Sequence, residues 1–297
     1  MAHEMAYVNG KVVPVGEASV SVYDRSFLYG DGCFDTAVAR GRRVFRLEAH
    51  VDRLMRSMRV LRIEAPLTRE GFRETALDLL RRNDMVDGFL RIVVSRGTCA
   101  YVSLDPRTAM GGATVVMLTR GAEPPRAIAA IHGDAQGIRA ITASIRKTPT
   151  ASLESRVKAN NYLNGILARW EAIDAGVDEA ILLDARGMVT EGTGDNLFAV
   201  CRGRLVTPPA LNILEGITRE TILAMAPTVP IVVDVREMTP YDLYTADEVF
   251  LTSTVIGVQP ILELDGRMIG SGKRGPVAAR LQSLYDEVLL REGTPFA

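Results

Sequence analysis

Lys158, in the stretch RVKANNYLNG, is the residue whose placement most needs a chemical explanation. Apolar residues at helical spacing, Tyr162, Ile166, Trp170 and Ile173, predict an amphipathic helix with a buried stripe and with Lys158 at its start. A cation there faces the positive end of the helix macrodipole and is disfavoured. A lysine fixed at the boundary of an element is a candidate for Schiff-base chemistry, which requires a neutral amine. The alternative is an ordinary surface lysine, because lysines are rarely buried.

A carboxylate and a helix start offer two further chemical groups. Glu191, in VTEGTGDN, follows a predicted strand and precedes a glycine-rich turn, where it is either an exposed loop carboxylate or a ligand-binding group. In EGITRET, Gly216 precedes a helix whose first turn carries Thr218. Backbone N–H groups together with a hydroxyl make a phosphate site at such a helix start. Most helix starts bind only water or a cap, so the pattern alone leaves both interpretations open.

Other chemistries lack their residue patterns. The G-x-G clusters at Gly30 and Gly192 have no third glycine three positions on, and GRMIGSGKR has Arg274 where a phosphate loop needs Ser or Thr. The histidines are isolated and no HExxH occurs, so we expect His50 to be a surface or capping residue and predict no metal site. No G-x-S-x-G anchors a serine hydrolase.

Composition limits the class of protein and of partner. The 297 residues are too many for one small core and suggest two domains. A net charge of -1 gives no reason to bind nucleic acid or membranes, so we expect a small-molecule partner. Three scattered cysteines without a CxxC indicate neither disulfides nor zinc. Without a leader-like start or a long apolar run, we expect a cytoplasmic protein.

Strands and helices must together position these groups. AYVNGKVVPV predicts a hairpin through Asn9 and Gly10, and apolar spacing predicts helices near 47–61 and 72–80. Because strands and helices alternate without a regular βαβ repeat, we expect an α+β fold. Composition changes at RGAEPPRA. The expected organisation is an N-terminal domain at 1–120, a linker at 121–130 and a C-terminal domain at 131–297.

Eight stretches, taken in chain order, resemble the class IV aminotransferases, which are pyridoxal-phosphate enzymes of fold type IV. They are SVYDRSFLYGDGCFDT, HVDRL, FLRIVVSRG, SLDPR, RVKANNYLNGILARWEA, DEAILLDARGMVTEGTGDNLF, LEGITRETI and DEVFLTSTVIGVQPI. The resemblance covers nearly the whole chain. It implies a two-domain α+β fold with mixed sheets and flanking helices, a cofactor enclosed between the domains, and a homodimer that completes each site.

The resemblance also implies a role for each cofactor residue. Lys158 would form an aldimine with the cofactor aldehyde and move the proton between substrate and cofactor. Glu191 would keep the pyridine nitrogen protonated, so that the ring accepts electrons. The other implied contacts are Tyr162 at the ring hydroxyl, Asn196 orienting the glutamate, Leu214 on the ring, and Arg53, Gly216, Ile217, Thr218 and Thr254 at the phosphate.

The substrate side of the site is most similar to branched-chain aminotransferases. Strand alternation places Arg91 on one face with Phe89 among apolar neighbours, where it is either an edge-strand arginine or a cation for the substrate carboxylate. The resemblance favours the second role. Tyr29 and Phe34 match aromatic pocket positions, and Thr36, Thr254 and Val255 are further expected substrate contacts. These matches favour an L-branched-chain amino acid as donor and 2-oxoglutarate or another 2-keto acid as acceptor.

Three departures leave alternatives open. Phe89 replaces the usual tyrosine, Thr36 replaces a glycine and resembles aminodeoxychorismate lyase, and residues 99–102 replace a polar turn. Arg96 and Arg107 flank that altered loop, and either could bind a carboxylate. The alternatives are a D-amino acid or (R)-amine transaminase of mixed specificity, the lyase, which Arg91 and Tyr162 oppose, and a non-catalytic relative that only binds the cofactor.

Overall fold

The chain folds into two compact units in the computed structural model, which describes residues 4–121 and 137–296. The first unit comprises Met1–Ala122, Val157–Asn161 and Val288–Ala297, and the second comprises Glu123–Arg156 and Tyr162–Glu287. The expected domain at 131–297 therefore differs from the structure in two segments, which fold with the first unit. Apart from Gly121, the expected linker at 121–130 lies outside the described residues.

The first unit is built on a seven-stranded antiparallel sheet in the order β17-β4-β3-β5-β8-β1-β2. Its strands are β1 (Met5–Val8), β2 (Lys11–Pro14), β3 (Gly32–Arg40), β4 (Arg43–Val44), β5 (Gly88–Ser95), β8 (Thr114–Gly121) and β17 (Thr294–Pro295). The other elements are η1 (Val15–Glu17), α1 (Arg25–Tyr29), α2 (Leu47–Leu61), α3 (Arg69–Arg82), η2 (Pro106–Thr108) and a small ribbon of β6 (Thr98–Cys99) with β7 (Ala109–Met110). The predicted hairpin is confirmed, with Asn9 and Gly10 both at positive φ between β1 and β2.

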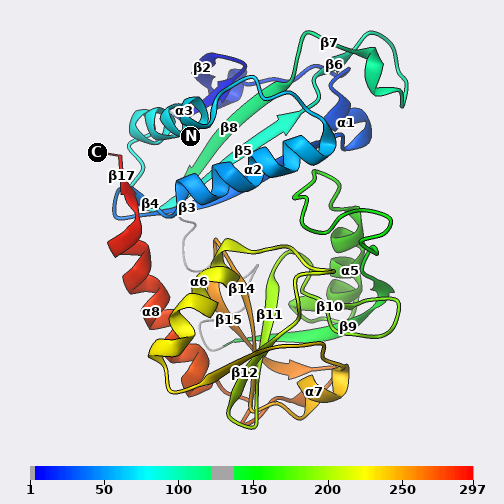
Figure 1. Ribbon diagram of the computed structural model, residues 1–297, viewed down its shortest axis with the longest axis vertical. Coiled ribbons are helices and arrows are strands. Elements are labelled where there is room, and N and C mark those ends of the chain that lie inside the picture. Colours follow the sequence, from blue (N-terminus) through cyan, green and yellow to red (C-terminus); the bar gives the residue numbers. More distant parts are fainter. Residues whose placement is uncertain (1–3, 122–136, 297) are drawn as a thin grey trace. The chain divides into compact units, whose positions relative to one another are not determined.

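Helices α2 and α3 pack against this sheet, as Figure 1 shows. Apolar residues at steps of three and four, such as Leu47, Val51 and Leu54 on α2, face the sheet and are fully buried. Leu90 and Val94 meet them from β5. Burial of such side chains stabilises the fold by about 1.5–3 kcal/mol each, so this core fixes where α2 presents its polar residues.

The second unit contains an eight-stranded mixed sheet, ordered β10-β9-β15-β14-β11-β12-β13 with β16 beside β15. Its strands are β9 (Ile138–Arg146), β10 (Glu179–Leu183), β11 (Asn196–Cys201), β12 (Arg204–Thr207), β13 (Val232–Val235), β14 (Glu248–Ser253), β15 (Gly257–Leu264) and β16 (Arg267–Met268). The helices are α5 (Leu163–Asp174), α6 (Ile217–Met225), η3 (Ala226–Thr228) and α7 (Pro240–Tyr244). The last helix, α8 (Pro276–Glu292), belongs to the second unit up to Glu287, and its remaining residues belong to the first unit. Pairs β9–β10, β9–β15 and β12–β13 are parallel and the others antiparallel. The predicted α+β class with mixed sheets is confirmed.

Lys158 does not lie at a helix start, so that prediction is wrong. Helix α5 begins at Leu163, and Lys158 lies before it in an extended segment that pairs with the start of β3. The Phe34 amide donates to the Lys158 carbonyl at 3.0 Å, and the Asn160 amide donates to the Gly32 carbonyl at 2.9 Å. The lysine is thus held by backbone pairing, and the expected conflict with the macrodipole does not arise.

The buried stripe predicted for α5 is also wrong. The residues that α5 buries are Ala168 and Ala172, whereas its large apolar residues are exposed, with Trp170 at 56%. The exposed set is Leu163, Ile166, Leu167, Trp170 and Ile173. Small residues face the sheet because β9 and β10 approach the helix closely, and the large apolar face points away from it.

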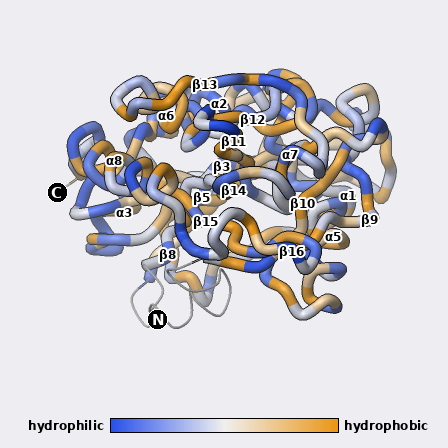
Figure 2. Tube along the Cα trace, turned by 90° about the horizontal axis from the view of Figure 1, so that it is seen from below, coloured by the Kyte–Doolittle hydropathy of each residue, from blue (hydrophilic) through white to orange (hydrophobic). Residues whose placement is uncertain are grey.

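Apolar residues recur along the helices and strands of the chain, in orange in Figure 2. Within the described ranges, none of the helices combines the length and the apolar character needed to cross a bilayer.

Candidate active site

The Lys158 segment is tied to helix α2 in the first unit. The Lys158 amide donates to the Ser57 hydroxyl at 3.3 Å, and that hydroxyl donates to the Arg53 carbonyl at 3.0 Å. Ser57 is one of the residues that α2 buries. The start of β3 must be glycine here, because a Cβ at Gly32 would lie 2.5 Å from the backbone carbonyl oxygen of Val94 and 2.6 Å from Asn160 Nδ2. These contacts fix the backbone of the lysine segment.

Two cations flank the ring of Phe34. Lys158 Nζ lies 4.6 Å from the ring centroid and the Arg91 guanidinium carbon lies 4.7 Å from it. Arg91 Nε also donates to the Thr36 hydroxyl at 3.1 Å, across the β3–β5 pair. The structure therefore brings together Lys158 and three of the residues predicted to serve the substrate, Phe34, Thr36 and Arg91. Phe89, two residues along β5, pairs with Val38 on the same strands.

Tyr29, the last residue of α1, contacts a different arginine. Its ring lies 5.2 Å from the guanidinium carbon of Arg25. The next residue, Gly30, approaches Asn161 in the lysine segment. Tyr29 therefore precedes Gly30, the residue that lies beside Asn161 of the lysine segment.

Arg53 is held by a buried carboxylate, that of Asp35. Arg53 Nε and Nη2 donate to the two carboxylate oxygens, each at 2.8 Å. His50, one turn earlier on α2, lies 2.7 Å from Asp35 Oδ1 through Nδ1. The Thr36 amide donates to the same oxygen at 2.8 Å. A bidentate pair of this kind fixes the plane of a guanidinium, so Asp35 sets the orientation of Arg53.

The charges of this cluster follow from burial and pairing. Burial raises the pKa of Asp35, but Arg53 and His50 outweigh it and hold that pKa well below its usual range. Burial lowers the pKa of His50 and exceeds the opposing effect of Asp35. The histidine is therefore neutral, and Nδ1 carries the proton given to Asp35. His50 is 1% exposed, so the expected surface or capping role is wrong, and its Nε2 has no hydrogen-bond partner among the described residues.

The buried His50 should make the stability of the fold depend on pH. Because its pKa is lowered in the fold, the unfolded chain binds a proton below about pH 6.5 that the folded chain does not. Stability should therefore decline as the pH falls through that value. Thermal unfolding against pH measures the decline, and His50→Gln should remove part of it. If His50→Gln shows the same decline of stability with falling pH as the wild type, other titrating groups cause that decline.

Glu191 is one of the buried carboxylates of the second unit. It lies between β10 and β11, and its carbonyl accepts from the Leu182 amide at 2.9 Å. Oε2 accepts from Asn196 Nδ2 at 3.0 Å and from the Leu214 amide at 3.1 Å, and Oε1 accepts from Lys147 Nζ at 2.6 Å. Only 6% of the residue is exposed. The structure thus joins Glu191 to Asn196, which the resemblance expected to orient it, and to the backbone amide of Leu214, which the resemblance expected to pack on the cofactor ring.

Asn196 links this carboxylate to the start of α6. Its Nδ2 also donates to the Leu214 carbonyl at 3.0 Å, and a Cβ at Gly216 would lie 1.9 Å from its Oδ1. Only glycine allows that approach. Gly216 is the N-cap of α6, and glycine has no side chain that could cap the helix. Within the described part of the chain, the N–H groups of Ile217 and Thr218 therefore receive no capping hydrogen bond from the N-cap side chain. The Thr218 hydroxyl lies 3.3 Å from the Tyr285 hydroxyl.

The remaining predicted residues lie at element ends. Tyr162 is the N-cap of α5 and half-buried. Thr254 and Val255 form the turn after β14, where Val255 is 49% exposed. Thr252, two residues earlier, is buried beside Asn196 in the β11–β14 pair, and its hydroxyl has no partner among the residues that the structure describes. The roles of Tyr162, Thr254 and Val255 stay predictions.

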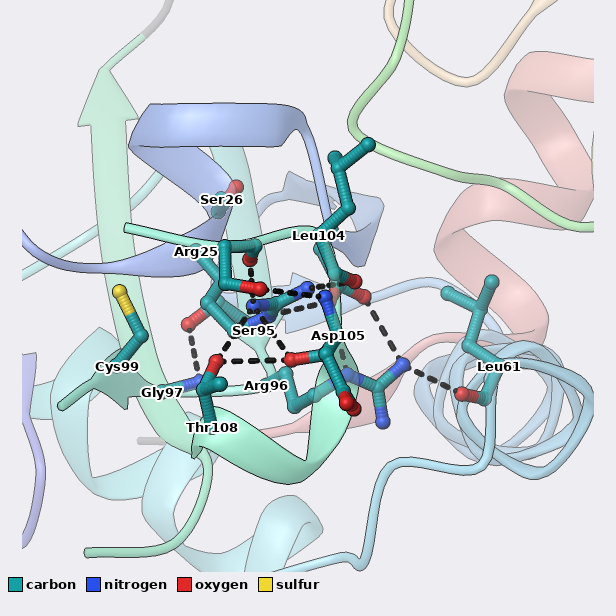
Figure 3. A network of polar contacts seen from close by, with 12 residues as sticks. Arg25, Ser26, Leu61, Ser95, Arg96, Gly97, Cys99, Leu104, Asp105 and Thr108 are labelled. Carbon is teal, nitrogen blue, oxygen red and sulfur yellow. Dashed lines mark hydrogen bonds and ion pairs between the residues drawn. The ribbon is translucent and has the colours of Figure 1, made fainter. Parts of the chain in front are cut away.

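Arg96 and Arg107, which the sequence offered as carboxylate ligands, are engaged within the chain. Arg96 forms a two-bond pair with Asp31 and donates to the carbonyls of Leu61 and Arg62. Arg107 pairs with Asp105. Figure 3 shows Arg96 reaching Leu61 beside this network. The contacts of Arg96 argue against it as a substrate ligand, whereas the exposed Arg107 stays a prediction.

Arg25 holds the altered loop after Gly97. Its guanidinium donates to the carbonyls of Ser103 and Leu104 at 2.8 and 3.1 Å, and Nε pairs with Asp31 at 2.8 Å. Figure 3 shows Arg25 inside the loop that it bonds. Arg25 is 2% exposed. The loop is thus anchored from α1 rather than through its own apolar residues.

Three residues of these clusters were missed in the sequence. Asp35 and Ser57 carry no motif of their own, although HVDRL placed His50 and Arg53 one turn apart. Lys147 lies 44 positions before Glu191, and nothing in the local pattern pairs them. The available signal was only that a buried carboxylate needs a partner.

Comparisons with known proteins show which family the chain resembles. Residues 32–264 match the family model described as amino-transferase class IV. A putative branched-chain-amino-acid aminotransferase of Methanocaldococcus jannaschii is 42% identical over 97% of both chains. Two solved branched-chain aminotransferases are similar in structure. That of Thermoproteus uzoniensis, solved with norvaline, has a TM-score of 0.89, 34% identity and coverage of 99% of both chains. That of Thermobaculum terrenum, solved in its PLP-form, has a TM-score of 0.86, 27% identity and coverage of 98% of this chain and 96% of its own. The chain therefore belongs to the class IV aminotransferase family.

Proposed function

We propose that this protein is a pyridoxal-phosphate-dependent aminotransferase that takes the amino group of a branched-chain L-amino acid and gives it to 2-oxoglutarate or another 2-keto acid. The observation that carries the proposal is the pair of cations on the Phe34 ring, Lys158 at 4.6 Å and Arg91 at 4.7 Å. An amino acid presents an amine and a carboxylate on one carbon. An amine nucleophile and a carboxylate-binding cation beside one apolar ring suit that substrate.

The residues present fit pyridoxal phosphate. The buried carboxylate of Glu191 suits a protonated ring nitrogen, because a carboxylate accepts strong charge-assisted hydrogen bonds from a cationic N–H. The start of α6 has no side-chain cap among the described residues and suits a phosphate, and Arg53 suits a phosphate by charge and geometry. When bound, the cofactor supplies an electron sink for the bonds of the amino acid α-carbon.

The chain's own groups would then perform the remaining work. Arg91 would bind the substrate carboxylate and orient the α-carbon. Lys158 Nζ would accept the proton from that carbon and deliver it to the aldehyde-derived carbon of the cofactor, and in the second half-reaction it would carry a proton in the opposite direction. Glu191 would retain the proton on the ring nitrogen, and Asn196 and the Leu214 amide would keep that carboxylate in place.

The branched-chain preference rests on the named relatives and on the apolar ring of Phe34 beside Arg91. All three relatives reported above carry the name of branched-chain aminotransferase. A second candidate is a transaminase for D-amino acids or (R)-amines, because Phe89 lacks the hydroxyl that the usual tyrosine brings to the carboxylate side of the pocket. Thr36 is a further departure and resembles the lyase instead. Tyr162, Thr254 and Val255 are proposed contacts of the cofactor or the substrate.

A panel of donors tests the substrate class. The loaded protein is mixed separately with L-leucine, D-alanine, (R)-1-phenylethylamine and aminodeoxychorismate, and the visible band of the cofactor is followed in a stopped-flow instrument. We expect fast loss of the band with L-leucine. Conversion by D-alanine or the amine but not by leucine would replace the leading candidate with the second, and pyruvate release without a keto acid would identify the lyase.

Arg91→Ala provides the matched arm of that panel. If Arg91 binds the substrate carboxylate, its loss should raise the activation free energy of the reaction with L-leucine by roughly 1.5–3 kcal/mol, which is the contribution of a hydrogen bond to a charged group. The amine lacks a carboxylate and should be affected less. Equal losses for both donors would show that Arg91 only supports the strand pair.

We also propose that the protein is a homodimer, the assembly expected from its sequence. The exposed apolar residues of α5 support this, with Ile166 at 52% and Trp170 at 56% on one face of the helix. An exposed apolar face of this kind marks an interaction surface. A second apolar surface lies on the anchored loop, where Tyr101, Val102 and Leu104 are 64%, 62% and 77% exposed. The expected cytoplasmic location stays a prediction.

Trp170→Glu and Ile166→Glu should shift the dimer toward monomer. A charge placed in the centre of an apolar interface costs about 2 kcal/mol or more, which is more than a tenfold rise in the dimer dissociation constant. Light scattering coupled to size exclusion measures it over a concentration series. Asp174→Asn, exposed at the end of the same helix, is the control and should change nothing. A monomeric wild type, or dimers that tolerate both charges, would remove this interface.

A further inference from the structure

Lys147 is a cation placed directly on the buried carboxylate of Glu191. Its Nζ lies 2.6 Å from Oε1, and its side chain is 22% exposed. The residue follows the last residue of β9, and its amide donates to the Leu183 carbonyl of β10 at 2.8 Å. Both ends of the side chain are thus fixed by the second unit. Within the described residues, Glu191 is the acidic group that the structure pairs with this lysine.

Glu191 is oriented without the help of Lys147. The Asn196 side chain and the Leu214 amide both donate to Oε2, and both donors are held by the loop that leads into α6. Lys147 adds one contact to the other oxygen. Its larger contribution is a full positive charge beside a carboxylate in a site that is mostly shielded from water, where charges interact more strongly than in bulk water.

A second cation influences the same carboxylate from α6. Arg219 is 7% exposed and donates to the Pro208 carbonyl at 2.9 Å. Burial lowers the pKa of Arg219, and the charges of Glu191 and then Glu215 oppose that fall. Two positive charges therefore act on Glu191, that of Lys147 in direct contact and that of Arg219 through space. Glu215 also acts on Arg219 by its charge.

We propose that Lys147 sets the strength with which Glu191 holds the proton of a cationic ring nitrogen. The ammonium group offsets part of the carboxylate charge, so the ring nitrogen faces a weaker anion than an isolated glutamate would be. This inference rests on the proposed function, because it needs Glu191 beside the ring nitrogen. Lys147 is a positioning residue in this scheme, since it acts through Glu191.

Removing the ammonium group should strengthen the hold on that proton. Lys147→Met keeps most of the side-chain stem and removes the charge, and Lys147→Gln is a second neutral variant of different shape. In both variants we expect the ring nitrogen to stay protonated to a higher pH, by about half to one pH unit, as for the loss of one nearby charge in a partly exposed site. Lys147→Arg retains the charge and should keep the wild-type midpoint.

The experiment reads the proton directly rather than the activity. Protein is loaded with pyridoxal phosphate labelled with ¹⁵N in the ring, and the ¹⁵N chemical shift, which separates protonated from unprotonated pyridine, is followed against pH. Lys273→Met, which removes the other lysine of the second unit, is the matched control and should leave the midpoint unchanged. Circular dichroism at each pH confirms that every variant is folded.

The outcomes separate this inference from the proposed function. A wild type that does not bind the cofactor overturns the function, and a Glu191→Gln variant with an unaltered ring nitrogen overturns the role of Glu191. If both behave as proposed, an unchanged or lowered midpoint in the two neutral Lys147 variants overturns the inference alone. A raised midpoint in both, with Lys147→Arg and Lys273→Met unchanged, supports it.

Discussion

Lys158→Ala is expected to slow amino transfer by at least about 10²–10⁴-fold, the range for a lost general base, and to abolish covalent attachment of the cofactor. The fold should survive this change. The hydrogen bonds that fix the segment use the backbone of Lys158, through the Phe34 amide and the Ser57 hydroxyl, and the alanine variant keeps both. The substitution removes the amine, together with its approach to the Phe34 ring. We therefore expect a chemical defect rather than a structural one.

Two measurements check this expectation. Borohydride reduction followed by mass spectrometry shows whether the cofactor is attached to the peptide that contains Lys158, and single-turnover kinetics with L-leucine give the rate. Lys273→Ala, an exposed lysine, is the control and should retain both. A Lys158→Ala variant that still attaches the cofactor and turns over at a wild-type rate would contradict the assignment of the catalytic amine.

The elements that depend on local pattern were predicted well. Asn9 and Gly10 adopt positive φ because both turn positions of a tight hairpin require it, and Asn–Gly tolerates that at little cost. Helix α2 follows from apolar residues at steps of three and four that only one helical face can bury. In both cases the cause lies within a few residues of its effect, so a single sequence contains it.

The errors arose where the same pattern has two physical outcomes. The apolar spacing on α5 was correctly interpreted as a helix, but spacing does not reveal which neighbour covers the apolar face. The helix turns Ala168 and Ala172 to its own sheet and leaves Trp170 exposed. Lys158 was placed on the helix because the helix follows it closely in the chain, whereas Val157–Asn161 folds with the first unit. Such a pairing between distant segments cannot be derived from local periodicity.

The sequence indicated which residues could bind the cofactor and the substrate, but not the residues that hold them in place. Lys158, Glu191 and Arg91 were named from motifs, and the structure gives each of them close partners. Asp35 and Lys147 were not named, because they contact Arg53 and Glu191 across 18 and 44 positions. A charge that a motif marks as buried nevertheless implies an opposite charge beside it, which is how such supports can be sought.

Asp35→Asn is expected to lower the free energy of unfolding by about 3–5 kcal/mol, as for a buried ion pair that loses one partner. The amide cannot accept both Arg53 bonds with a full charge, so a cation is left buried at 4% exposure. Urea unfolding measures the change. Asp52→Asn on the same helix as Arg53 is the matched control, because Asp52 pairs with Arg69 at the surface and should matter far less. Equal effects of the two variants would mean that the buried pair adds nothing.

Asp35 should also affect how the protein binds an anion, because its two hydrogen bonds fix the plane of the Arg53 guanidinium. If that guanidinium holds the cofactor phosphate, Asp35→Asn should weaken binding of pyridoxal phosphate more than binding of pyridoxal, which lacks the phosphate. The folded variant and the wild type are titrated with each ligand at a pH well above the usual pKa of an aspartate. Because only folded protein is titrated, a difference between the two ligands is separated from the loss of stability. Equal losses for the two ligands would mean that Asp35 stabilises the fold without preparing Arg53 for an anion.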